Sequence, residues 1–429
     1  MERVLLRKMT EWKDSPHRKP LLLWGARQTG KTWLMKEFGR LYFNNTVYIS
    51  FYNNRKMAGI FESDYDVRRI INAVEVEMHT EIIPQETLLI FDEVQAAPKV
   101  VESLKYFCED AKEYAVVAAG SLLGVALHEG VSFPVGMVDE LRLYPMSFRE
   151  FLLACGEERL AEYIQDYKRP EVADFSDRYK ELLKCYYCVG GMPEAVSRYI
   201  EHRNIDDARE VQISILHQYE GDFGKHIKEN ELPRIRMVWN SLPMQLAKEN
   251  KKFFFGQIRH GARQKEFELA IHWLEDAGLI IRVNKVSKPA MPLRSYVEFS
   301  SFKIYMIDVG LLGALSELET ASVLHGDALF SEFKGALTEQ YVVQETVAQG
   351  KYTPYYYSGE KSVYEVDLLI QKGRDVVPVE VKAEDNLRSK SLRFYCEKYK
   401  PGIAFRTSAA NYRDQEWMIN VPLWAIAGV

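Results

Sequence analysis

Cysteine is scarce in this chain, with five residues among 429. Thiols so few and so scattered do not build a disulfide framework, which fits a reducing compartment. Cys185 and Cys188 form a C-x-x-C pair, but no second C-x-x-C or H-x-x-H pair completes a tetrahedral zinc site. Their neighbours in CYYCVGG are aromatic and apolar. We therefore interpret the pair as buried structural thiols rather than as a metal or redox site.

Long apolar runs are also missing. The longest nearly uncharged run, Ala115 to Leu127, is interrupted by Gly120 and Ser121, and it is shorter than the roughly 20 apolar residues that cross a bilayer. The first residues, MERVLLRKMTEW, place charges among the apolar side chains and lack the continuous core of a signal peptide. The sequence therefore predicts a soluble cytoplasmic protein with no membrane-spanning part.

No sign of charge dominates, because 56 Lys and Arg face 61 Asp and Glu and leave a net charge of −5. This balance excludes a protein that packages nucleic acid through a uniformly positive surface, so any basic surface is local. Hydrophobic residues make up 47% of the chain and no long low-complexity stretch dilutes them, which excludes wholesale disorder. A chain of 429 residues exceeds what one hydrophobic core usually organises, and we expect several domains.

Four segments differ in their pattern of apolar residues. In residues 1–143 short apolar runs alternate with helical stretches, which is typical of a doubly wound parallel sheet, with strands expected at 21–24, 46–51, 87–94 and 114–121. Residues 144–230 show one amphipathic helix after another and predict a helical lid domain. Residues 231–310 show helices followed by a β-ribbon, as in a winged helix, and residues 311–429 return to an α/β pattern. The predicted fold class is therefore α/β, with a parallel-sheet domain first, a helical and winged-helix-like middle, and a C-terminal α/β domain.

A glycine-rich octapeptide follows the first predicted strand directly. It satisfies G-x-x-x-x-G-K-[ST], and its members are Gly25, Ala26, Arg27, Gln28, Thr29, Gly30, Lys31 and Thr32. Such a P-loop turns successive backbone N–H groups toward phosphate oxygens, and the helix after it points its positive end at the same place. We expect Lys31 to neutralise the β and γ phosphates and Thr32 to ligate Mg²⁺. The structural alternative is a chance glycine-rich turn, and the flanking strand and helix weigh against it.

Two adjacent carboxylates end the apolar strand in LLIFDEVQ, residues 88–95. The pattern predicts that Asp92 holds Mg²⁺ through water, and that Glu93 orients and deprotonates the attacking water. On its own, a strand that ends in Asp-Glu would more often be a solvated entrance to a loop. Together with the P-loop it predicts that the chain binds ATP or GTP with Mg²⁺.

Two further roles in hydrolysis are assigned less uniquely by the sequence. Ser121, at the end of the strand predicted over 115–121, is placed either to sense the γ-phosphate and the lytic water or to cap the helix that follows. A positive group must also meet the charge that develops on the γ-phosphate. Arg142 and Arg149 are candidates within the chain, and a neighbouring subunit of a homo-oligomeric ring or dimer is the alternative source.

The middle of the chain carries the clearest local excess of positive charge. Residues 251–300 hold nine Lys or Arg against five Asp or Glu. The helix predicted over EFELAIHWLEDAGLI is acidic, so contact with DNA would fall to the preceding helix or to a wing that carries Arg282, Lys285 and Lys288. The alternative is a lid or packing module, because a modest excess of charge often marks only a solvated face.

A second group of charged residues lies in the C-terminal segment. Asp367 is placed at the end of one predicted strand, in SVYEVDLLI, and the period of two sends Glu380 and Lys382 to the same face of the next strand. A hairpin would bring Asp367 against them, and Glu339 lies on the preceding helix. Two carboxylates that converge with a lysine can hold Mg²⁺ and stabilise a hydroxide that attacks phosphorus. The alternative is an ion cluster that caps an ordinary sheet.

Taken together, the motifs GARQTGKT, LLIFDEVQ, AAGSLLG, LRLYPMSFREF, VGGMPEAV and QYEGDFGKHI resemble prokaryotic AAA-superfamily ATPases. Members of that family carry a C-terminal domain of unknown function that is similar to restriction endonucleases. The resemblance spans nearly the whole chain and implies ATP rather than GTP. The C-terminal group resembles a PD-(D/E)XK nuclease core, which implies Asp367 and Glu380 as metal ligands, Lys382 as the catalytic cation and Glu339 as the helix carboxylate.

Two functions remain as alternatives on these grounds. In the first, ATP binding and hydrolysis reposition the winged-helix-like and nuclease-like domains on nucleic acid. In the second, the chain is a nucleotide-controlled module that binds DNA or another protein through a nuclease fold that does not cut. A transcription regulator that works through the wing is a third hypothesis.

Overall fold

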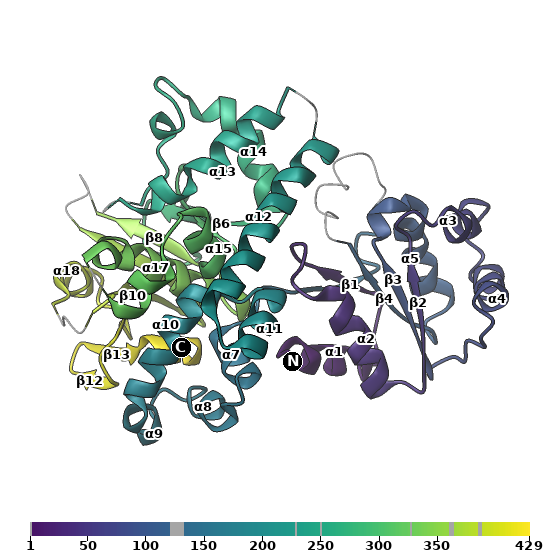
Figure 1. Ribbon diagram of the computed structural model, residues 1–429, viewed down its shortest axis with the longest axis horizontal. Coiled ribbons are helices and arrows are strands. Elements are labelled where there is room, and N and C mark those ends of the chain that lie inside the picture. The colour runs from purple at the N-terminus through teal and green to yellow at the C-terminus, as the bar shows by residue number, and fades with distance from the viewer. Residues whose placement is uncertain are drawn as a thin grey trace. The chain divides into compact units, whose positions relative to one another are not determined.

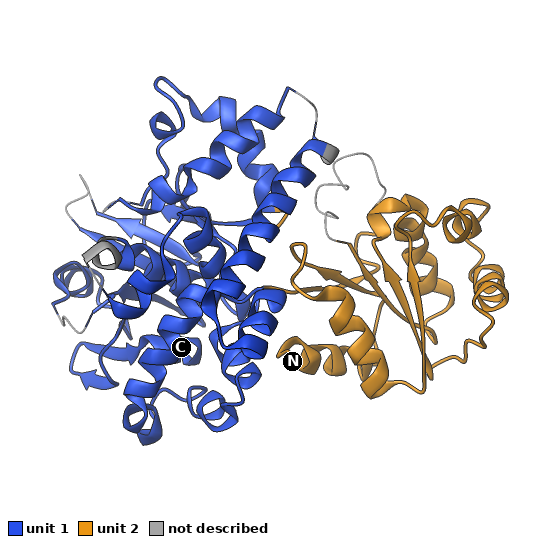
Figure 2. Cartoon of the chain, in the orientation of Figure 1, with its two compact units in different colours: residues 1–2, 145–275, 279–429 blue, residues 3–144, 276–278 orange. Residues whose placement is uncertain are grey.

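The computed structural model describes residues 2–120, 133–227, 230–248, 251–326, 328–359, 364–384 and 388–429 (Figure 1). The chain divides into two compact units, coloured separately in Figure 2. The N-terminal unit comprises residues 3–144 with 276–278, and the C-terminal unit comprises residues 1–2, 145–275 and 279–429. None of the helices in the described ranges has both the length and the apolar character needed to span a bilayer.

A five-stranded sheet forms the centre of the N-terminal unit. Its order is β2-β3-β4-β1-β5, and all neighbours pair in parallel. The strands are β1 (Leu21–Trp24), β2 (Asn45–Ser50), β3 (Thr87–Asp92), β4 (Ala115–Ala119) and β5 (Asp139–Arg142). Every residue of β3 and β4 is buried, as expected of parallel strands that are covered on both faces. The predicted parallel α/β sheet is confirmed.

Helices cover both faces of this sheet. They are α1 (Leu5–Lys13), α2 (Lys31–Tyr42), α3 (Arg55–Glu62), α4 (Val67–Met78) and α5 (Pro98–Asp110). Helices α1 and α2 bury Trp12 and Phe38 in one hydrophobic core, whereas α3, α4 and α5 contribute Phe61, Val74 and Phe107 to the other. This double cover holds the carboxyl ends of β1 and β3 at one edge of the sheet, where the P-loop and the acidic pair begin.

The first half of the C-terminal unit is helical. Its elements are α7 (Phe148–Ala154), α8 (Glu158–Tyr163), α9 (Pro170–Asp174), α10 (Ser176–Val189), α11 (Pro193–His202), α12 (Ile205–His226), α13 (Leu232–Leu246), η3 (Phe255–Gln257) and α14 (Gln264–Asp276). In α10, Cys188 is buried and Cys185 is half-buried, and both are free thiols. Burial raises the pKa of each thiol, which fits the prediction of structural rather than reactive cysteines.

An eight-stranded mixed sheet organises the second half, in the order β12-β13-β11-β10-β9-β8-β6-β7. Its strands are β6 (Ile280–Val286), β7 (Val297–Met306), β8 (Tyr355–Ser358), β9 (Glu365–Lys372), β10 (Asp375–Val381), β11 (Phe405–Ser408), β12 (Arg413–Gln415) and β13 (Met418–Pro422). The helical elements around it are η4 (Leu293–Tyr296), α15 (Val309–Leu315), α16 (Thr320–His325), α17 (Ala328–Ala348), α18 (Lys390–Tyr399) and η6 (Leu423–Gly428). Helix α17 contacts both β7 and β10, so its side chains can meet residues of these two distant strands.

The β-ribbon that the sequence assigns to a winged helix is the antiparallel hairpin of β6 and β7. Its first strand also pairs in parallel with β8, through Asn284 with Tyr355 and Lys285 with Tyr356. The ribbon therefore continues the sheet that carries β9 and β10. The sequence could not reveal this pairing, because it joins segments about seventy residues apart in the chain. A DNA-binding winged helix stays a prediction.

Candidate functional site

The P-loop connects β1 to α2 and is held by its own backbone and by one outside side chain. Gly25 has φ 153°, and a Cβ there would lie 2.4 Å from the carbonyl oxygen of Leu143. The Thr29 hydroxyl donates to the carbonyl oxygen of Ala26 at 2.9 Å. The guanidinium of Arg3 donates to the carbonyl oxygen of Thr29 at 2.8 Å. These contacts fix the curvature that a phosphate-binding loop requires.

Lys31 occupies the first turn of α2, directly after Gly30, and is 7% exposed. Its ammonium donates to the carbonyl oxygens of Gly25 at 2.8 Å and Ala26 at 2.7 Å. Burial lowers the pKa of Lys31 to about 8, although the nearby carboxylates of Glu93 and Asp92 oppose the shift. A buried ammonium of this kind would gain strongly from an anionic ligand, because its direct contacts within the described residues are carbonyl dipoles.

Asp92 and Thr32, both proposed from the sequence as Mg²⁺ ligands, lie in direct contact. The Thr32 hydroxyl donates to Oδ2 of Asp92 at 2.6 Å, and the Asp92 side chain is buried at the end of β3. Tyr48 on β2 also donates to Oδ2 of Asp92, at 3.0 Å. Burial, with the charge of Asp92, raises the pKa of Tyr48 to about 12, so its hydroxyl stays a donor. The geometry brings a hydroxyl and a carboxylate together beside Lys31, which is the donor set that Mg²⁺ prefers in P-loop sites.

Glu93 begins the turn after β3 in a left-handed conformation, with φ 55° and ψ 42°. Such a conformation costs a non-glycine residue about 1–3 kcal/mol and can mark a functional site. The side-chain amide of Gln95 donates to the Glu93 carboxylate. Glu93 is close enough to Lys31 to raise the lysine pKa against the effect of burial. The predicted acidic pair is therefore assembled with the P-loop within one unit.

The remaining candidates of the N-terminal half differ in what surrounds them. Arg27 lies in the P-loop, where its charge lowers the pKa of Lys31, and Gln28 has φ 64°. Ser121 lies outside the described residues. Arg142 stacks over the ring of Tyr144, 5.9 Å from its centroid, whereas Arg149 donates to the carbonyl oxygen of Ala161 at 3.2 Å within the C-terminal unit. The cation that meets the γ-phosphate stays a prediction.

In the C-terminal unit, Glu339 lies on α17 at the centre of a buried charge cluster. Lys303 Nζ contacts Oε1 of Glu339 at 3.0 Å and Oε1 of Glu365 at 2.7 Å. Lys251 and the Tyr305 hydroxyl bind the same Glu339 carboxylate. Burial alone would raise the pKa of Glu339, but Lys251 and Lys303 hold it at about 2. Glu339 is therefore an ionised carboxylate that is already paired within the protein.

Asp367, Glu380 and Lys382 meet beside this cluster. Asp367 and Glu380 are the next residues beyond the paired Leu368 and Val379 of β9 and β10. Oδ2 of Asp367 accepts a hydrogen bond from the Val381 N–H at 2.8 Å, and Lys382 Nζ lies 2.8 Å from Oε1 of Glu380. Burial and the nearby Glu339 raise the pKa of Asp367 to about 7.

Mg²⁺ in proteins is usually held by one or two carboxylates that face one point, with water and substrate oxygens as its other ligands. Among the residues that the structure describes, no group of three or more His, Cys, Asp or Glu is arranged to hold a metal ion. Oε2 of Glu380 is buried, and no described residue forms a hydrogen bond with it. The set of Glu339, Asp367 and Glu380 as metal ligands stays a prediction.

Sequence analysis missed the cations that neutralise Glu339. Lys303 is buried in the otherwise apolar end of β7, and Tyr305 shares its face of the strand. An isolated lysine inside a buried strand was the available signal, because such a lysine is rarely buried without a carboxylate partner. Lys251 and Tyr48 gave no comparable signal, because their partners come from distant elements.

The cations predicted for a wing also have local partners. The Arg282 guanidinium donates to the carbonyl oxygen of Phe299 at 2.9 Å. Lys285 Nζ lies 3.2 Å from a carboxylate oxygen of Glu298, and Lys288 Nζ lies 6.0 Å from the ring centroid of Tyr296. Since these contacts partly neutralise the ribbon, its positive charge alone is weak support for nucleic-acid binding.

Three family models match successive parts of the chain. Residues 17–152 match an AAA domain. Residues 180–322 and 334–426 match two domains of unknown function, DUF8612 and DUF4143. No curated protein matches the chain.

Several solved structures match the chain at low sequence identity and with TM-scores below 0.5. A Walker-type ATPase of Pyrococcus abyssi is 15% identical, with 72% of this chain and 94% of that chain covered and a TM-score of 0.44. The Orc1 protein of Aeropyrum pernix in complex with DNA is 14% identical, with 74% and 93% covered and a TM-score of 0.28. AMPPCP-bound DnaA from Aquifex aeolicus is 14% identical, with 64% and 86% covered and a TM-score of 0.28.

The match of residues 17–152 coincides with the parallel sheet and with the assembled P-loop, Asp92 and Glu93. Residues 17–152 therefore resemble an AAA domain, with the P-loop and the acidic strand end assembled in one unit.

Proposed function

We propose that the N-terminal unit binds ATP with Mg²⁺ and hydrolyses it. The observation that carries this proposal is the 2.6 Å contact between the Thr32 hydroxyl and the Asp92 carboxylate, next to the buried ammonium of Lys31. Each group has a defined task in phosphoryl transfer, and the three come from elements that the sheet fixes relative to one another.

The protein groups divide the work as follows. The P-loop N–H groups and Lys31 bind the phosphates and neutralise their charge. Mg²⁺, when held by Thr32 and Asp92, supplies further positive charge at the phosphate oxygens. Glu93 orients the water and accepts its proton, since its carboxylate lies beyond the strand end and beside the phosphate-binding loop. The left-handed backbone at Glu93 supports this role, because it fixes where the side chain starts.

Two variants test this proposal. Lys31→Ala is expected to abolish ATP binding, because it removes the buried ammonium, whereas Glu93→Gln is expected to keep binding and suppress turnover. Binding of a fluorescent ATP analogue and release of phosphate measure the two effects separately. Arg40→Ala is the matched control, since Arg40 is an exposed cation on the same helix as Lys31 and pairs only with Glu37 among the described residues. Normal ATP binding by Lys31→Ala would refute the P-loop assignment.

For the C-terminal unit we propose a nuclease-like fold that acts on nucleic acid under control of the ATPase. Glu380 and Lys382 lie together at the end of β10 and Asp367 on the adjacent strand, which supports a metal-dependent cleavage site. The alternative is a binding module that contacts DNA or another protein without cutting. The contacts of Glu339 with Lys251, Lys303 and Tyr305 favour this alternative, because they already neutralise one predicted ligand.

Cleavage assays on the full chain separate these two versions. Cleavage of single- or double-stranded DNA with Mg²⁺ or Mn²⁺, lost in Asp367→Ala and Lys382→Ala but kept in the exposed-site control Lys351→Ala, supports the nuclease. An absence of cleavage across both metals and DNA forms supports the binding module. The ATPase rate with and without DNA tests the proposed coupling, and its dependence on protein concentration tests a homo-oligomer that shares a cation between subunits.

A further inference from the structure

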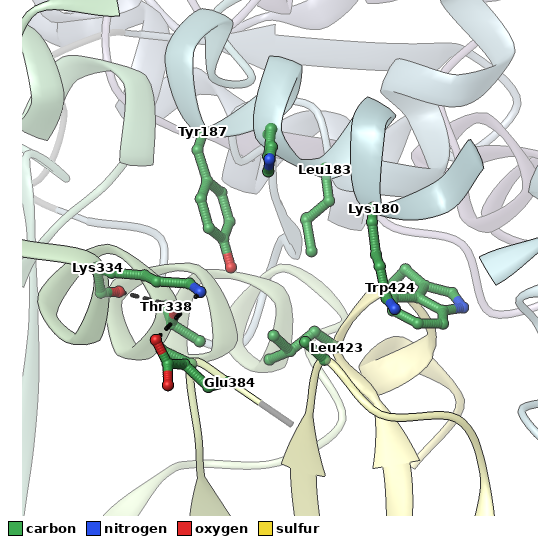
Figure 3. Close-up of a pocket in the computed structure, with 11 residues that line it drawn as sticks. Lys180, Leu183, Tyr187, Lys334, Thr338, Glu384, Leu423 and Trp424 are labelled. Carbon is green, nitrogen blue, oxygen red and sulfur yellow. Dashed lines mark hydrogen bonds and ion pairs between the residues drawn. The ribbon is translucent and has the colours of Figure 1, made fainter. Parts of the chain in front are cut away.

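A pocket of about 430 Å³ lies within the C-terminal unit, between α10, α17 and η6 (Figure 3). From α10 it is lined by Lys180, Leu183, Lys184 and Tyr187, which recur at the spacing of one helix face. This face alternates ammonium groups with apolar side chains. The volume of the pocket lies within the roughly 300–1,000 Å³ that small-molecule sites occupy.

Charge in the pocket is predominantly positive. Lys180 and Lys184 on α10 face Lys334 on α17, and Glu384 is the acidic residue of the lining. Lys184 Nζ donates to the carbonyl oxygen of Leu324 at 3.3 Å, and Lys334 Nζ lies 3.7 Å from Glu384. Lys180 Nζ also lies 3.9 Å from Oδ1 of the exposed Asp177, which is not part of the lining. Three half-buried ammonium groups against one lining carboxylate favour an anionic ligand, because the partly apolar walls reduce screening by water.

A buried hydroxyl adds a polar group that is directed into the same space. Tyr187 is 5% exposed, and Figure 3 shows its hydroxyl pointing from α10 toward Thr338 on α17. The Thr338 hydroxyl lies near enough to influence the Tyr187 pKa, but among the described residues no group meets the Tyr187 hydroxyl at the distance and angle of a hydrogen bond. The Thr338 hydroxyl itself donates to the carbonyl oxygen of Lys334 at 2.8 Å. Burial raises the pKa of Tyr187, so the group stays protonated and can donate to a ligand. An unmet buried donor is costly, and a bound acceptor would relieve that cost.

Apolar walls complete the lining. Leu183 lies on α10, and Leu423 and Trp424 come from η6, where Trp424 stacks on Tyr179. We propose that this pocket binds a nucleoside phosphate, with its phosphate among the three ammonium groups and its base against the apolar wall. The phosphate meets the positive charge, the base covers Leu183 and Leu423, and the Tyr187 hydroxyl donates to a base or sugar acceptor. Either a free mononucleotide or the phosphorylated end of a strand carries this chemistry.

Binding to the full chain with Lys31→Ala tests the proposal without a contribution from the P-loop. The probes are adenosine 5′-monophosphate and a 5′-phosphorylated single-stranded oligonucleotide, with adenosine and the same oligonucleotide bearing a 5′-hydroxyl as controls. At least one phosphorylated probe should bind. Binding of adenosine 5′-monophosphate alone identifies a free mononucleotide as the ligand, binding of the oligonucleotide alone identifies the end of a strand, and binding of both shows that the pocket accepts either. Lys184→Ala should weaken binding about 10-fold, because it removes a charge-assisted contact. Lys351→Ala, an exposed-site control, should leave binding unchanged.

A second variant keeps the test independent of any damage that Lys184→Ala does to folding. Glu384→Gln removes the negative charge of the lining and should tighten binding of the phosphorylated probe several-fold. Failure of both phosphorylated probes to bind overturns the proposal. Equal affinity for the unphosphorylated controls, or affinity that neither Lys184→Ala nor Glu384→Gln changes, overturns it as well. Because Lys31→Ala is present throughout, these results do not depend on the ATPase assignment.

Discussion

The two buried lysines at the candidate sites have opposite electrostatic environments. Lys31 in the N-terminal unit donates to two backbone carbonyl oxygens, and burial lowers its pKa to about 8. Lys303 in the C-terminal unit contacts two carboxylates, and these raise its pKa well above the ordinary value although burial acts against them. The difference distinguishes a cation held ready for an external anion from one that is already neutralised inside the fold.

The largest expected effect is on the neutralised lysine. Lys303→Met keeps the volume of the side chain but leaves Glu339 and Glu365 without a shared cation, so we expect a loss of about 3–5 kcal/mol in the free energy of unfolding. Chemical denaturation of the full chain, followed at the transition of the C-terminal unit, measures it. Lys351→Met, at an exposed position, is the control. If Lys303→Met lowers the free energy of unfolding no more than Lys351→Met does, Lys303 does not stabilise the cluster.

A second carboxylate on α17, Glu345, has no lysine partner in the part of the chain that the structure describes, and it extends the comparison. Glu345 is buried, and its Oε1 accepts a hydrogen bond from the Phe148 N–H at 2.8 Å. Burial, with a smaller effect of Glu150, raises the pKa of Glu345 to about 8. Its ionisation therefore opposes folding, and the cost grows as the pH rises from the ordinary carboxyl pKa toward 8, the reverse of the dependence expected for Glu339.

Glu345→Gln should remove this cost while keeping an acceptor for Phe148. We expect the variant to exceed the wild type in unfolding free energy by about 2–4 kcal/mol at pH 9, with the gap closing toward pH 5. Denaturation curves at the two pH values measure the gap. A difference that is the same at both values would show that Glu345 does not titrate in this range.

A smaller effect is expected from Tyr48, which orients Asp92. Tyr48→Phe removes the donor to Oδ2, so Asp92 should hold Mg²⁺ less well and the Mg²⁺ concentration for half-maximal ATPase should rise about 3–10-fold. A magnesium titration of the ATPase rate measures this shift. Tyr52→Phe is the control, because Tyr52 is 64% exposed. An unchanged titration would mean that Tyr48 has no positioning role.

The smallest expected effect is on stability at the P-loop. Lys31→Met should not lower the free energy of unfolding, because burial of this ammonium, which lowers its pKa to about 8, opposes folding at neutral pH, and no direct carboxylate partner among the described residues offsets that cost. Denaturation without nucleotide measures it. A loss as large as that of Lys303→Met would erase the proposed distinction between the two lysines.

How much was predictable from the sequence depends on how local each feature is. The P-loop and its flanking strand and helix are contiguous, and Asp92 and Glu93 follow from the end of one apolar strand, so the sequence was enough to propose these members of the N-terminal site. The contact of Tyr48 with Asp92 depends on the pairing of β2 with β3, and the sequence does not state that register. Lys251 and Lys303 meet Glu339 across more distant elements, which is why the neutralised cluster was not foreseen.

The pairing of β6 with β8 has a mechanical consequence. The hairpin of β6 and β7 cannot swing as a free wing, because backbone hydrogen bonds tie it through β8 and β9 to β10. Force applied by any partner that grips the hairpin would travel from strand to strand toward Asp367 and Glu380. A displacement of the β6–β7 hairpin would therefore also shift the strands that carry Asp367 and Glu380.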